Sequence, residues 1–189
     1  MTGHHTLAET ERAAAARLGG IPLRWEQMHA AANLHRAAAA VRLHFENSVL
    51  RGPDLTWTAF VVLWVVWIWD ELETRHVAEE AGISKGTLTG VVKTLESRGL
   101  VARTRHTGDG RLVLLALTED GERLMEELFP AFNAEEVFVT DPLSAAQCAT
   151  LADLLRAVIG QVEEHGEQRR AELHAQGAPP RRGGRRSAG

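Results

Sequence analysis

Apolar residues recur along this chain with a helical period over most of its length. Spacings of three to four residues predict amphipathic helices, because such positions share one face of a helix. Thr56 and Ser144 stand where helix caps are expected, with Asp54 as an alternative to Thr56, and Pro130 is expected to bend the helix that holds it. The helices predicted on this basis cover 7–18, 22–51, 56–70, 119 onward and 145 to about 167.

Residues 59–69, AFVVLWVVWIW, form the longest apolar run. Its valines and tryptophans also suit a buried strand, but its length favours a core helix. A membrane-spanning helix needs roughly 20 such residues, so this run is too short to cross a bilayer.

A different pattern occupies residues 74–100, where two short helical stretches flank a glycine. Ala78 is small where the helices must touch, Gly82 suits a left-handed turn, Ile83 fills the space beneath it, and Ser84 can cap the second helix. This arrangement predicts a helix-turn-helix, which places its second helix in the major groove of DNA. Leu88, Val91 or Val92, and Leu95 supply the buried stripe of that helix.

The period then changes to two. Residues 100–105 and 112–117 alternate as half-buried strands do, and Asp109-Gly110 between them is a hairpin signal. A hairpin directly after a recognition helix is a wing. It carries Arg103, Arg105, His106 and Arg111, and arginine suits a narrow, electronegative minor groove.

Together these segments make residues 55–121 resemble the MarR family of bacterial transcription regulators. The matching stretches are LTWTAFVVLW, the helix-turn-helix and DGRLVLLALTEDG, in which Asp109-x-Arg111, Leu117-Thr118 and Gly121 are the most specific. The resemblance implies a mainly α winged helix-turn-helix with a β-hairpin wing and interlocking N- and C-terminal dimerisation helices. It further implies that Arg111 reaches the minor groove and that Asp109 holds the wing tip. Gly90 departs from the larger polar or basic residue that the family often has there.

Five regions are expected from these patterns. Residues 177–189 contain too few apolar groups to fold, and the tail's arginines can also add phosphate contacts. The expected regions are a flexible extension (1–20), a dimerisation helix (21–54), the DNA-binding domain (55–121), further dimerisation helices (122–168) and a disordered basic tail (169–189).

The charge distribution supports a nucleic-acid partner although the net charge is −4. Residues 74–111, here called the reading head, hold seven Lys/Arg and four Asp/Glu, so the remainder carries −7. An acidic body limits non-specific adhesion to nucleic acid.

A single cysteine excludes an intrachain disulfide, and no secretory signal is visible. A bacterial cytoplasmic protein, at the nucleoid through DNA binding and not in a membrane, is expected.

Two apolar helix faces need a partner. A homodimer would cover them and would place two recognition helices roughly 34 Å apart on a palindromic double-stranded operator. The proposed dimer residues are Leu143, Leu151, Leu154, Leu155, Val158 and Ile159 in the last helix, and Leu124, Leu128, Phe129 and Phe132 in the helix before it.

The mechanism that we expect is repression by operator occupancy, relieved by a small molecule. Threonine and lysine side chains can bond base edges or phosphates, and which of these they bond is open. A solvated helix face is the alternative for the lysines, and an ion pair with Asp109 is the alternative for Arg111. The candidate DNA-binding residues are Ser84, Lys85, Thr87, Thr89, Gly90, Lys93, Arg103, Arg105, Asp109 and Arg111.

The resemblance suggests a small, often anionic aromatic effector between the dimer helices and the reading head. An aromatic stripe at helical spacing is more often core than ligand pocket, and the His and Arg can equally form dimer salt bridges. The candidate effector residues are His35, Arg42, Trp57, Trp64 and Trp67.

Other modes of action have weaker support. Cys148 has no cationic neighbour in sequence, which disfavours redox sensing, and the scattered His29, His35 and His44 disfavour a metal sensor. No catalytic motif or cofactor-binding signature indicates an enzyme. A winged helix that contacts protein instead of DNA remains an alternative.

Overall fold

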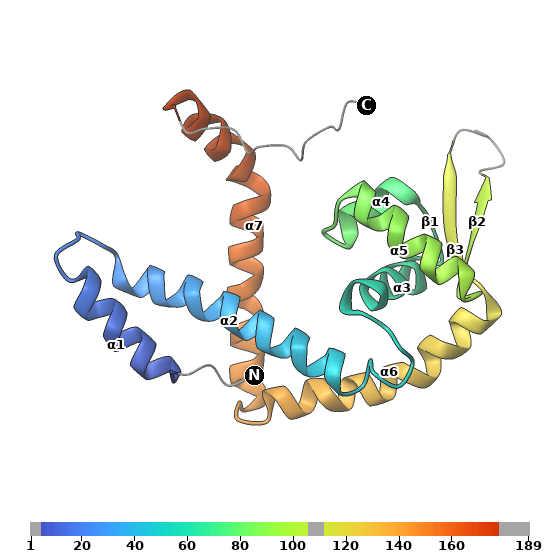
Figure 1. The fold of residues 1–189 in the computed structure, drawn as a ribbon, viewed down its shortest axis with the longest axis horizontal. Helices are drawn as coiled ribbons and strands as arrows, with labels where there is room; N and C mark the ends of the chain where they lie inside the picture. Colours follow the sequence, from blue (N-terminus) through green and yellow to red (C-terminus); the bar gives the residue numbers. More distant parts are fainter. Residues whose placement is uncertain (1–4, 106–111, 178–189) are drawn as a thin grey trace. The chain divides into compact units, whose positions relative to one another are not determined.

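The computed structural model describes residues 5–105 and 112–177, and the side chain of Arg105 is not described. The chain divides into two units, one up to Glu135 and the other from Glu136. The boundary falls inside a helix. Figure 1 labels the elements.

Two helices precede the core of the first unit. α1 (Leu7–Leu18) starts in a capping box in which Thr6 and Glu9 bond each other's backbone N–H. The Thr6 backbone and side chain donate to the Glu9 carboxylate and lower its pKa. α2 (Trp25–Asn47) is shorter than the predicted 22–51, because the backbone leaves helical geometry at Ser48.

α3 (Trp57–Trp69) confirms that the apolar run is a helix. The Thr56 hydroxyl caps it by accepting from the N–H of Ala59 at 3.2 Å. Asp54, the alternative cap, instead has a left-handed φ of 52°. Six residues of α3 are buried and it packs against the elements of the reading head, so this helix forms the centre of the first unit.

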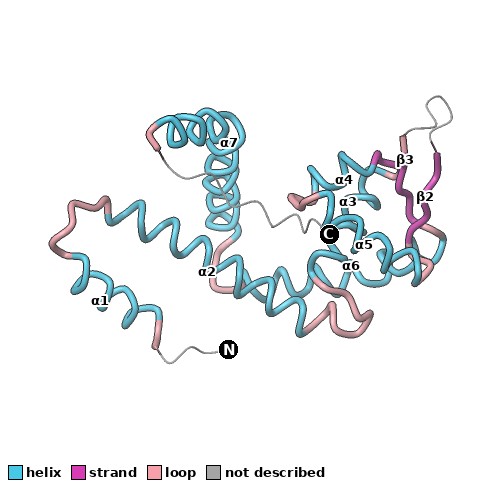
Figure 2. The backbone as a smooth tube through the Cα atoms, turned by 45° about the horizontal axis from the view of Figure 1, so that its top comes forward, coloured by secondary structure: helices cyan, strands magenta, loops and turns pink. Residues whose placement is uncertain are grey.

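A small antiparallel sheet adjoins α3 (Figure 2). Its strands are β1 (Glu71–Glu73), β2 (Val101–Arg105) and β3 (Val113–Leu117), in the order β1-β3-β2. β2 and β3 confirm the predicted hairpin. β1 was not predicted, because three residues with two glutamates carry no strand pattern.

α6 (Glu119–Thr140) follows the sheet and continues through Pro130 as one helix. Met125, Leu128 and Phe132 on α6 are buried in the first unit. The Phe132 ring lies 4.2 Å from that of Phe60 and 4.6 Å from that of Phe45, measured between centroids. The prediction that Leu128 and Phe132 cover a second subunit is therefore wrong, because both side chains are already buried within one chain, Phe132 against rings of α2 and α3.

α7 (Ala145–Ala175) forms most of the second unit. Ser144 caps it in a capping box with Gln147, as expected for this serine, and the helix runs eight residues beyond the predicted end near Glu167. None of its residues is buried. The exposed large apolar side chains of this helix are those of Leu151, Leu154, Val158, Ile159, Val162 and Leu173.

Candidate nucleic-acid interface

The helix-turn-helix consists of α4 (Thr74–Glu80) and α5 (Lys85–Ser97). Gly82 has φ of +62° at the turn, where a Cβ would be strained. The N–H of Ile83 then donates to the carbonyl of Ala78 at 3.0 Å, which closes the end of α4. Ala78 is 3% exposed. The roles predicted for Ala78 and Gly82 are confirmed.

Ser84 caps α5. Its Oγ accepts from the N–H of Thr87 at 3.0 Å and lies 2.8 Å from the Thr87 hydroxyl. A cap of this kind satisfies a backbone donor that the helix cannot pair. Ser84 therefore has a structural role in addition to the contact with DNA predicted for it.

α5 is divided cleanly into a buried and an exposed face. Leu88, Val92 and Leu95 are the buried residues. The candidate residues Lys85, Thr87, Thr89, Gly90 and Lys93 are all exposed. The side chains predicted to approach DNA are thus available to solvent on one helix.

The hydroxyl of Thr89 is already used within the helix. Thr89 Oγ1 donates to the carbonyl of Lys85 at 2.8 Å, so its free lone pairs can only accept from a ligand. Gly90 presents bare backbone instead, since a Cβ built there would meet nothing within 4 Å. The fold itself therefore does not require glycine at position 90.

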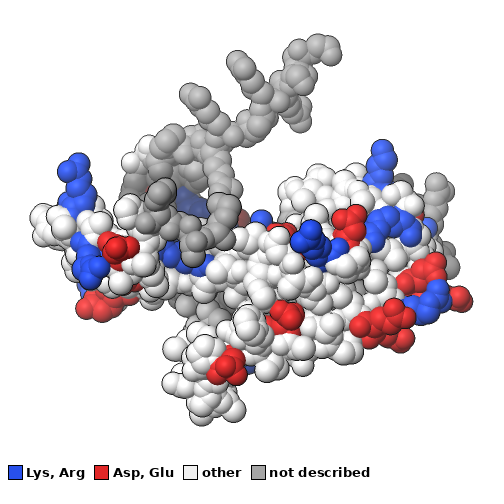
Figure 3. All heavy atoms as spheres, turned by 60° about the horizontal axis from the view of Figure 1, so that its bottom comes forward, with Lys and Arg blue, Asp and Glu red and all other residues white. Residues whose placement is uncertain are grey.

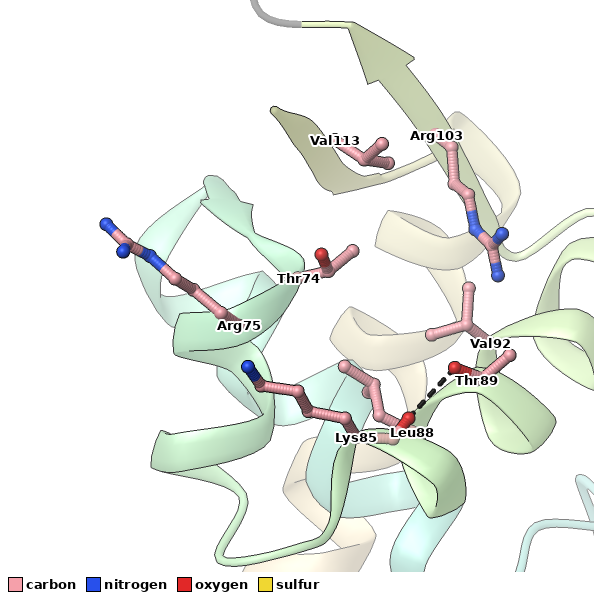
Figure 4. A pocket seen from close by; sticks show the side chains of 8 residues that line it. All are labelled: Thr74, Arg75, Lys85, Leu88, Thr89, Val92, Arg103 and Val113. Carbon is pink, nitrogen blue, oxygen red and sulfur yellow. Dashed lines mark hydrogen bonds between the residues drawn. The ribbon is translucent and has the colours of Figure 1, made fainter. Parts of the chain in front are cut away.

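A depression of about 350 Å³ lies beside α5 (Figure 4). Leu88, Val92 and Val113 give it an apolar lining, and the guanidinium of Arg103 reaches from β2 toward α5. Its polar lining residues are Thr74, Arg75, Lys85, Thr89 and Arg103. Of these, Thr74 and Arg75 on α4 were not candidates, because nothing in their local sequence marks them.

Both arginines of this depression are paired with glutamates. Arg103 Nη2 lies 3.3 Å from Glu96 Oε2, and Arg75 Nε lies 2.8 Å from Glu73 Oε2. Within residues 5–105 and 112–177, no carboxylate forms a salt bridge with Lys85 or Lys93. The unpaired positive charge of α5 therefore resides on its two lysines.

The tip of the wing is outside the described residues. His106, Asp109 and Arg111 all lie in 106–111, and Arg105 is placed only as the last residue of β2. Their proposed contacts with DNA rest on the sequence.

Three of the five candidate effector residues line one groove of about 680 Å³ in the first unit: His35, Arg42 and Trp57. Glu46 lines it too and was not predicted. Its Oε1 accepts from the N–H of Trp57 at 3.0 Å, and its Oε2 lies 3.9 Å from Arg42 Nε. This carboxylate would compete with an acidic ligand for Arg42.

Trp64 and Trp67 lie apart from that groove. Their rings are 5.8 Å apart, and Phe129 of α6 stacks on Trp64 with a centroid distance of 4.8 Å. They form an aromatic cluster between α3 and α6. The candidate effector residues therefore divide between a groove and a packing cluster.

Cysteine, histidine and acidic side chains are the groups that redox or metal sensing would use. In the part of the chain that the structure describes, no three His, Cys, Asp or Glu side chains could hold a metal ion together. Cys148 is half-buried, with Sγ 4.0 Å from the carbonyl oxygen of Leu143. Among the same residues, no single helix is long and apolar enough to span a membrane, and only the bent pair α6 and α7 together reaches that length and composition.

Known proteins share both the sequence and the fold. The MarR family model matches residues 55–113. The uncharacterized HTH-type transcriptional regulator YwaE of Bacillus subtilis is 36% identical over 158 residues, which cover 82% of this chain and 92% of that protein.

Two solved structures extend the comparison. A cysteine-to-serine mutant of MarR from E. coli, complexed with operator DNA, is 25% identical with a TM-score of 0.65 and is covered to 95%, against 70% of this chain. Bordetella bronchiseptica BpsR, whose DNA binding is regulated by 6-hydroxynicotinic acid, is 28% identical with a TM-score of 0.64; the match covers 98% of it and 69% of this chain. With its helix-turn-helix, three-stranded sheet and these relatives, the chain belongs to the MarR family of transcriptional regulators.

Proposed function

We propose that this regulator is a homodimeric repressor that binds a palindromic operator in double-stranded DNA and is released by a small anionic aromatic effector. The observation that carries the proposal is the exposure of Lys85 and Lys93 on α5, a helix whose buried side chains fix it in the core. A helix held in this way can enter the major groove without rearrangement.

In this proposal α5 supplies the major-groove contacts. Lys85 and Lys93 bond phosphates or guanine edges, and Thr87 and Thr89 accept bonds or contact thymine methyl groups. Gly90 lets the DNA approach the backbone of the helix. Arg105 and Arg111 follow the wing into the minor groove, and Asp109 steadies its tip. The complex of a MarR mutant with operator DNA supports operator DNA as the ligand of this fold.

The second unit supplies the dimer contact. α7 has 31 residues and no buried side chain, while Leu154, Ile159 and Val162 are each more than half exposed. An apolar face of this length normally lies against another surface. We propose a second copy of the chain as that surface, and sedimentation at micromolar concentration tests it, since a monomeric mass would contradict the dimer.

The effector is proposed to bind in the groove of His35, Arg42 and Trp57. Arg42 can pair with a carboxylate and the Trp57 ring can stack on an aromatic ligand. The effect of 6-hydroxynicotinic acid on BpsR supports an acid of this class. The acid must displace Glu46 from Arg42, which favours ligands that also stack. Within the described residues, redox or metal control through Cys148 or the histidines has no comparable geometry.

The test of the proposed function is a gel shift with DNA from upstream of the protein's own gene, in a salt series, with a scrambled duplex as control. Preferential binding of the upstream DNA, weakened by salt, is expected. Equal binding of both duplexes, or none, would instead favour a winged helix that contacts protein.

A further inference from the structure

Arg103 leaves the sheet on the side that faces α5. It lies directly opposite Leu115 of β3, and opposed residues of antiparallel strands share one face. Leu115 is fully buried, and Val101, two residues before Arg103 on the same face, is 3% exposed. The guanidinium therefore emerges at the edge of the core beside the recognition helix, as Figure 4 shows.

Glu96 meets this guanidinium from α5. It is the single acidic residue of that helix. Its Oε2 lies 3.3 Å from Arg103 Nη2, and the two side chains are 32% and 39% exposed. A carboxylate on a helix that approaches phosphates would repel them. By pairing with Arg103, the Glu96 carboxylate also neutralises a positive charge on the surface proposed to bind DNA.

The ion pair between Arg103 and Glu96 is weak enough for Arg103 to exchange the carboxylate for another anion. Half-exposed ion pairs shift an equilibrium only about twofold to fivefold. A DNA phosphate offers the guanidinium the same bidentate geometry as a carboxylate and additionally releases counterions. Figure 3 shows basic and acidic side chains close together on one face of the molecule. Arg75 with Glu73 and Arg123 with Asp120 are further ion pairs, so pairing of a cation with an acid is not restricted to Arg103.

We propose that Glu96 is a positioning and masking residue for Arg103. In the free protein it holds the guanidinium beside α5 and cancels its charge. When DNA binds, a backbone phosphate replaces the carboxylate. The pairing of Glu96 with Arg103 lowers the affinity for any duplex that does not lie close enough to bring a phosphate to Arg103. This inference rests on the proposed DNA-binding function and adds a control of affinity to it.

The experiment is a double-mutant cycle on operator affinity, measured by fluorescence anisotropy at fixed salt. The variants are Glu96→Gln, Arg103→Gln and the two combined. Glu80 is an exposed glutamate on α4 that forms no salt bridge within the described residues, so Glu80→Gln makes the same change in charge without freeing an arginine. Thermal unfolding of each variant confirms that it is folded.

We expect Glu96→Gln to tighten binding about twofold to fivefold more than Glu80→Gln does. In the Arg103→Gln background this excess should vanish, because no cation is left to release. An excess that persists without Arg103, or an effect no larger than that of Glu80→Gln, would overturn the inference while wild-type binding to the operator stands. Absence of operator binding by the folded wild-type protein would overturn the proposed function as well.

Discussion

A Cβ atom on Gly121 would collide with the carbonyl oxygen of Leu100. This carbonyl also accepts from the N–H of Thr118 at 3.1 Å, and the Thr118 hydroxyl accepts from the N–H of Gly121 at 3.1 Å. The first turn of α6 is thus held against the residue that leads from α5 into the wing. Glycine is required here by close packing of backbone on backbone.

Gly121→Ala is therefore expected to lower the free energy of unfolding by about 1–3 kcal/mol through overpacking. Urea denaturation followed by circular dichroism measures the change. Gly90→Ala is the matched control, since its new methyl meets nothing within 4 Å. That variant should gain up to about 1 kcal/mol from helix propensity. Equal stabilities of the two variants would refute the packing argument.

Arg98 fixes the loop before α3. Its Nη1 donates to the carbonyl of Asp54 at 2.8 Å and its Nη2 to that of Pro53 at 2.6 Å. Arg98→Lys should cost about 1 kcal/mol of unfolding free energy, because one ammonium cannot reproduce the two-pronged geometry. Arg123→Lys, which alters an exposed pair with Asp120 on α6, should cost much less. Similar losses of unfolding free energy in both variants would show that the hydrogen bonds from Arg98 to the loop contribute no more stability than a surface ion pair.

Ligand binding in the groove is expected to quench tryptophan fluorescence through Trp57. Titration with phenolic carboxylates should show this quenching in the wild type. Trp57→Phe should abolish most of the signal, and Arg42→Gln should weaken the apparent affinity about tenfold, as for loss of a charged hydrogen bond. Trp67→Phe, outside the groove, is the control. Quenching lost with Trp67→Phe but kept with Trp57→Phe would place the ligand elsewhere.

For the wing, Arg111→Ala is expected to weaken operator binding and to reduce the salt slope by about one unit, as for loss of one phosphate contact. Gel shifts at several salt concentrations measure both quantities. Arg17→Ala, on the exposed side of α1, serves as the charge control. If Arg111→Ala binds like that control, Arg111 makes no contact with the DNA.

Local signals explain which parts of the fold the sequence could predict. Thr56, Ser84 and Ser144 all cap the helices expected for them, and Gly82 occupies the left-handed turn, because each role depends on a few neighbouring residues. β1 could not be predicted in this way. It exists because Glu71–Glu73 pair with β3, more than 40 residues further along the chain.

Contacts between elements that are distant in the chain determine features that the sequence pattern could not predict. Leu128 and Phe132 have the helical spacing of an interface, but periodicity cannot tell an intersubunit surface from the core of one unit. Glu96 and Glu46 look like ordinary surface acids in sequence. Only the placement of β2 beside α5 and of α2 beside α3 brings them to the arginine and the tryptophan that give them a role.

The most direct test of the account concerns the two lysines of α5. Operator binding of the double variant Lys85→Gln/Lys93→Gln should be measured by fluorescence anisotropy across a salt series, beside Arg12→Gln/Arg17→Gln as a variant of equal charge on α1. Weaker binding and a salt slope reduced by about two units are predicted for the lysine variant alone. An affinity and a salt slope equal to those of the wild type would contradict the claim that α5 binds the DNA through these lysines.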